Sequence, residues 1–232
     1  MSDTNIKIKM RLTSRQALEM FRKKKGKMIP TEKWDELRNE AHDKAFTVAN
    51  VMSADILQEV YSYVEKAMNE GIPFEQFKKD AVNKGLITRM QKTGWTGNSK
   101  YRLRLIYDTN IATARAKVAY QQQMLIKDVE PYWIYHQLER KTKNPEHAKL
   151  NGLKFRADDP IWHTIYPPSA FGCACWVEST DDPTGCVSSK GLQLNLDNFN
   201  LAPLKAWTPD VRKYNKKLQA ALSAELERGK KT

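Results

Sequence analysis

The feature that most constrains the fold is a change of hydrophobic pattern at Pro131. Before it, apolar residues recur every three or four positions, which is the spacing of amphipathic helices. After it comes an aromatic run at residues 132–136, and then short segments separated by prolines and glycines. We therefore expect an α+β protein, with a mostly helical N-terminal region followed by a small, irregular α+β domain.

Capping residues indicate where the predicted helices begin and end. Besides a short helix that Thr13 or Ser14 could cap and a helix over residues 31–46, three helices are expected, over residues 53–71, 73–85 and 100–125. Ser53 supplies an N-cap to the first of them and Gly71 a stop. The second should turn Phe74, Phe77 and Val82 towards the interior.

The second half should contain a strand at 132–136, a short helix capped by Asn144 that carries His147, and a short strand near residues 175–177. A basic helix is expected from about residue 208. The chain then divides into a basic N-terminal segment, a helical region, a small α+β domain, and an extended connector with the basic C-terminal helix, at residues 1–28, 29–127, 128–182 and 183–232.

The formal charge of +12 is concentrated at the two ends of the chain. Residues 1–28 hold 9 Lys/Arg against 2 Asp/Glu, residues 205–232 hold 8 against 3, and the rest is balanced. Basic ends are typical of proteins that contact nucleic acid or an acidic protein surface, although solvated tails look the same. The candidate DNA- or partner-binding residues are Lys23, Lys24, Lys25, Lys213, Lys216 and Lys217.

No apolar run approaches the roughly 20 residues that a membrane-spanning helix needs, and no signal peptide is recognisable. We therefore expect no membrane partner, and folding in a cytoplasm. In that compartment the three cysteines, Cys173, Cys175 and Cys186, should stay reduced. Clustered reduced thiols are usually metal ligands or simply buried side chains.

Several segments match one family in the same order. They are residues 32–36, 42–49, 94–95, 102–110, 131–135, 147–152, 159–162, 166–168 and 172–175. Together they resemble the phage Mu protein F-like minor head proteins over most of residues 15–180. The family usually has Gly-Cys-Arg-Cys where this chain has Ala174 between its cysteines, and an arginine-containing stretch where it has residues 141–143.

The resemblance implies a minor structural protein of a tailed-phage head that acts in head (procapsid) morphogenesis and resides in the virion. It implies action near the portal, with portal, scaffold or major capsid protein as partners and packaged DNA as a further candidate. It implies no enzymatic activity.

The residues themselves allow one metal-site hypothesis. Cys173, Cys175, His147 and His163 could supply the thiolate and imidazole ligands that Zn²⁺ prefers. The one-residue gap between the cysteines is shorter than the usual two, although alternate residues of an extended strand share a face. We favour the alternative, in which the thiols are buried and His147 is structural, so no cofactor is expected.

The alternative function is a metal-dependent nuclease or effector that uses His147 with the Cys173/Cys175 pair. Against it, the sequence shows no carboxylate cluster of the kind that Mg²⁺ requires.

Overall fold

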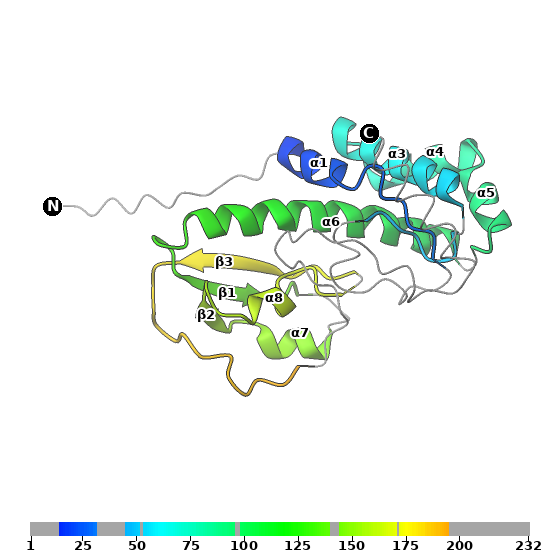
Figure 1. The fold of residues 1–232 in the computed structure, drawn as a ribbon. Coiled ribbons are helices and arrows are strands. Elements are labelled where there is room, and N and C mark those ends of the chain that lie inside the picture. The colour runs from blue at the N-terminus through cyan, green and yellow to red at the C-terminus, as the bar shows by residue number, and fades with distance from the viewer. Residues whose placement is uncertain are drawn as a thin grey trace.

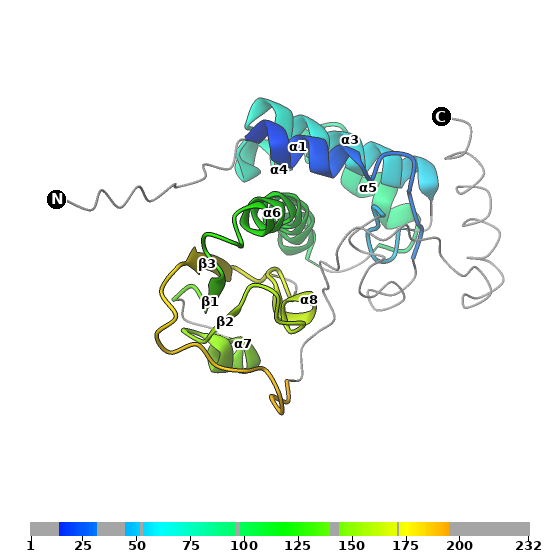
Figure 2. The same cartoon turned by 60° about the vertical axis from the view of Figure 1, so that its left-hand side comes forward.

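A long helix, α6 (Ser99–Leu125), lies between a layer of helices and a small sheet (Figures 1 and 2). The computed structural model describes residues 14–31, 45–51, 53–95, 98–139, 144–170 and 172–194. The predicted basic C-terminal helix lies outside these residues, as does most of the helix predicted over residues 31–46. Within them, no helix is long and apolar enough to cross a bilayer.

The helical layer is formed by α1 (Ser14–Arg22), α3 (Ala54–Glu70), α4 (Phe74–Asn83) and α5 (Leu86–Lys92). Ser53 caps α3 by accepting a hydrogen bond from the amide of Ile56, and Gly71 ends it with a φ of 66°. Helix α1 packs on both α3 and α6. Its Phe21 ring stacks on Tyr61 with centroids 4.7 Å apart, at the centre of the first hydrophobic core.

The prediction for Val82 is wrong. This side chain is 54% exposed, and Ala81 is buried in its place together with Phe74 and Phe77. At 100° per residue, positions 74, 77 and 81 fall on one stripe, whereas position 82 lies about 80° away from Phe74. Helix α5 was not predicted from the sequence. Gly85 precedes its first turn in a left-handed conformation.

The second half contains a three-stranded antiparallel sheet in the order β2-β1-β3. Strand β1 (Tyr132–His136) is central and pairs with β2 (Lys154–Arg156) and β3 (Trp176–Thr180). Two short helices, α7 (Pro145–Leu150) and α8 (Trp162–Ile165), complete the unit. The fold class is therefore confirmed as α+β, with the helical part first.

A second hydrophobic core joins this sheet to α6. Trp133 of β1 is fully buried, 5.7 Å from the ring of Tyr120 on α6 and 5.4 Å from that of Trp162 on α8 (centroid distances). A polar link reinforces the contact, because the side-chain amide of Gln123 donates to the carbonyl of Val177 and accepts from the Tyr166 hydroxyl.

Replacing Trp133 should therefore be far more costly than replacing Trp176, which is 50% exposed and stacks on His136. We expect Trp133→Ala to lower the free energy of unfolding by about 3–5 kcal/mol, through lost burial and the cavity left behind. Trp176→Ala, the matched control, should cost about 1 kcal/mol. Urea denaturation followed by far-ultraviolet circular dichroism measures both, and equal losses would contradict this account of the core.

Candidate functional site

His147 is placed by the short helix α7. The Asn144 side chain caps that helix by accepting from the amide of Glu146, and Pro145 occupies its first turn. The imidazole is 2% exposed. Its ring packs edge-on against that of Tyr135, with centroids 6.4 Å apart. A buried histidine at this position therefore faces the interior of the α+β unit.

Cys173 and Cys175 lie in the segment between α8 and β3. The amide of Cys173 donates to the carbonyl of Ala170, and Gly172 adopts the left-handed φ of 69° within that turn. Cys175 directly precedes β3. Alternate residues of extended chain face the same side, so both thiols can point at α7.

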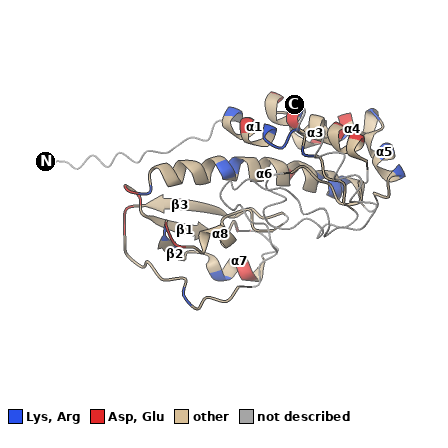
Figure 3. Ribbon diagram, viewed as in Figure 1, with Lys and Arg blue, Asp and Glu red and all other residues tan. Residues whose placement is uncertain are grey.

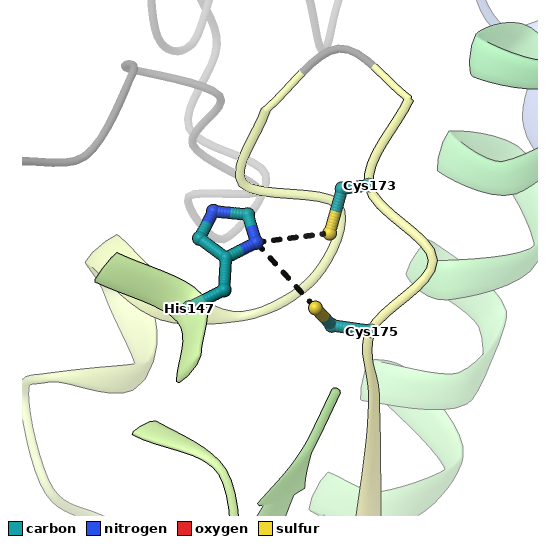
Figure 4. Close-up of side chains that lie close together, drawn as sticks. All are labelled: His147, Cys173 and Cys175. Carbon is teal, nitrogen blue, oxygen red and sulfur yellow. Dashed lines mark hydrogen bonds between the residues drawn. The ribbon is translucent and has the colours of Figure 1, made fainter. Parts of the chain in front are cut away.

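The structure brings these three side chains together (Figure 4). Nδ1 of His147 is 3.7 Å from Sγ of Cys173 and 3.5 Å from Sγ of Cys175. On the other side of the ring, Nε2 lies 3.3 Å from the hydroxyl oxygen of Ser169, which is itself fully buried. The three candidate ligand atoms all lie within 4.8 Å of one another.

The surroundings stabilise negative charge on sulfur. A hydrogen bond from Cys175, supported by His147 and by backbone amides, lowers the pKa of Cys173 to about 4 against the opposing effect of burial. Burial raises the pKa of Tyr135, and the negative charge of Cys173 adds to that rise, so this hydroxyl stays protonated beside the thiols. The hydrogen bonds around Cys173 therefore favour its thiolate form.

The two thiols also line a cavity of about 650 Å³ between α6 and the 166–177 segment. Its α6 wall carries small side chains, Ala112, Ala116 and Ala119, together with Arg115 and Asp108. The cysteine pair is therefore reachable from a space large enough for solvent or a small ligand.

The other predicted site residues fall elsewhere. His163 is exposed on α8 and does not belong to the cluster. Lys23 and Lys25 are exposed just after α1, whereas Lys24 is only 6% exposed, which makes its side chain unavailable to a partner. Lys213, Lys216 and Lys217 lie outside the described residues.

Two side chains that surround the cluster, Tyr135 and Ser169, were not predicted as part of it. Tyr135 could have been found, since it shares the buried face of a strand with Trp133 at a spacing of two. Ser169 as the partner of His147 gave no local signal, because 22 residues separate them.

Among the residues that the structure describes, no carboxylate joins the His147–Cys173–Cys175 group. A magnesium-dependent nuclease relies on carboxylate oxygens, so the cluster does not supply that chemistry. Its ligand types are instead those of softer metals or of a thiolate–imidazole pair.

Comparison with known proteins identifies a protein family that matches this chain. The model of the Phage Mu protein F like protein family matches residues 58–178. The chain is 36% identical over 185 residues to the putative capsid assembly protein F of Escherichia phage Mu, covering 73% of this chain and 40% of that protein. It is 34% identical over 177 residues to the Mu-like prophage FluMu F protein of Haemophilus influenzae, covering 71% and 41%. No solved structure is significantly similar.

The buried environment of His147 generates a stability prediction. We expect His147→Ala to lower the free energy of unfolding by about 1–3 kcal/mol, because it leaves the buried Ser169 hydroxyl without its partner. The matched control His163→Ala, on an exposed histidine, should change it by less than about 0.5 kcal/mol. Urea denaturation in buffer with a chelator separates this packing effect from any effect of a metal. Equal free energies of unfolding for the two variants would show that His147 contributes nothing to the core.

Proposed function

Because the chain belongs to the Phage Mu protein F-like family, we propose that it is a minor structural protein acting in the head assembly of a tailed bacteriophage. The observation that carries the proposal is the family match across residues 58–178, from within α3 to β3, which holds most of the residues of the two hydrophobic cores. A relative bearing the name of a capsid assembly protein supports it. The chain spans about two fifths of the length of the two curated relatives, so the proposal concerns the function shared by this part.

Partners in this role would be portal, scaffold or major capsid protein, and we place its action near the portal. Exposed apolar side chains support protein contacts. Six of the eight large exposed apolar residues in the described chain follow residue 124. They are Leu125, Val129, Leu138, Trp176, Val187 and Leu192. Covering these side chains with a partner would remove apolar surface from water, which favours association.

Quantitative mass spectrometry of purified phage particles and their empty precursors tests the head role. We expect a few copies per particle in both, because a structural component placed near a single vertex is needed in low number. Presence in precursors alone would indicate a shed assembly factor. Absence from both would contradict the proposal and favour the nuclease or effector alternative, which plasmid cleavage with and without chelator would then examine.

We also propose that the protein contacts packaged DNA through its basic ends. The described helices carry Lys/Arg and Asp/Glu near one another (Figure 3), whereas the excess positive charge of the sequence lies at residues 1–28 and 205–232. Of the three predicted N-terminal binding residues, Lys23, Lys24 and Lys25, the structure leaves Lys23 and Lys25 exposed.

We expect the double substitution Lys23→Glu/Lys25→Glu to weaken nonspecific DNA binding and to flatten its salt dependence, because each lost phosphate contact removes about one released counterion. Lys79→Glu/Lys92→Glu makes the same charge change at exposed positions of α4 and α5 and serves as the control. Mobility shifts over a salt series measure both slopes, alongside a chain that lacks residues 205–232. Equal slopes for all variants would rule out the basic ends as the DNA contact.

A further inference from the structure

The cluster of His147, Cys173 and Cys175 places two sulfur atoms against one ring nitrogen. Nδ1 of His147 faces two sulfur atoms at once, at 3.7 and 3.5 Å. A ring nitrogen has either one hydrogen or one lone pair to direct there. Meanwhile Nε2 is already engaged with Ser169, at 3.3 Å from its hydroxyl oxygen. Two sulfurs and one nitrogen therefore converge on a common point.

A metal ion at that point would account for the spacing. Zinc binds thiolate sulfur at about 2.3 Å and imidazole nitrogen at about 2.0–2.1 Å in a tetrahedral arrangement, which sets the nitrogen and each sulfur about 3.5 Å apart. The observed separations match this value closely. Thiolate and imidazole together select zinc over the hard cations that prefer oxygen.

We propose that His147, Cys173 and Cys175 bind one zinc ion, with a solvent molecule in the fourth position. The cavity beside the two thiols provides the room for that solvent molecule. Ser169 acts as a positioning residue: by accepting from Nε2–H it holds the tautomer whose Nδ1 lone pair points at the metal. The extended segment ending at β3 explains why a one-residue gap between the cysteines suffices.

The ion would connect two parts of the α+β unit that are distant in sequence. His147 comes from α7, whereas the cysteines precede β3, an edge strand of the sheet. Backbone pairing with β1, the stacking of Trp176 on His136 and the Gln123 contact also hold the start of β3. Zinc binding therefore stabilises the folded state by an amount that depends on zinc concentration.

The test measures zinc in the full chain, purified without a histidine tag or chelator, by inductively coupled plasma mass spectrometry. We expect one zinc per chain in the wild type and almost none in Cys173→Ser, Cys175→Ser or His147→Gln. Two matched controls, Cys186→Ser and His163→Gln, should keep the full amount, because neither residue belongs to the cluster. Ser169→Ala should keep the site but weaken its affinity about tenfold.

Cobalt spectra and melting temperatures are measured on the wild type alone, so they do not depend on whether a ligand variant folds. After Co²⁺ replaces zinc, we expect a thiolate-to-cobalt charge-transfer band and the intense visible bands of a four-coordinate ion. Chelation should lower the melting temperature of the wild type, and Zn²⁺ should restore it. Absence of bound zinc and of the cobalt bands would overturn the proposal, as would a Cys173–Cys175 disulfide in protein purified under reducing conditions. Equal zinc loss in the Cys186 control would also overturn it.

Discussion

Burial of α6 on two opposite sides is the constraint on which the rest of the structure depends. An isolated helix has little stability of its own, so most of the stability of its 27 residues comes from packing. Leu103, Ile106 and Ala114 join the first core, whereas Ala116, Tyr120 and Met124 pack against the second. Since both cores use the same helix, the helical layer and the sheet are held at a fixed spacing, and the cavity beside the cysteines is one result of that spacing.

The candidate site depends on this arrangement more than on any local motif. Tyr166 bonds to Gln123 of α6, which also bonds to the carbonyl of Val177, so α6 holds the segment that carries both cysteines at its two ends. From the other side, α7 presents a histidine whose backbone position is set by its own cap. The cluster thus forms where two independently determined pieces of chain meet, and a bound ion would strengthen a contact that packing already defines.

Head assembly and zinc binding are separate proposals, and both concern the rigidity of the α+β unit. A protein present in few copies at a crowded vertex has to display its contact surfaces on a rigid unit, and a small sheet with short edge strands has little core of its own to provide rigidity. Here α6 covers the sheet on one side, and a metal centre would fasten its edge strand. The exposed apolar side chains after residue 124 belong to the same unit, so its rigidity bears directly on the surface available to partners.

The sequence by itself determined the elements whose signals are local. Ser53, Gly71 and Asn144 mark helix ends through bonds to neighbouring residues, and the aromatic run at 132–136 has the alternation of a strand. The metal-site hypothesis named three of the clustered residues because their side-chain chemistry is visible in sequence. Only the tertiary structure shows that His163 faces solvent, that Lys24 is buried, and that Ser169 contacts His147. The reason is physical: caps and alternation act over a few residues, whereas burial and ligand geometry depend on packing between segments that lie tens of residues apart.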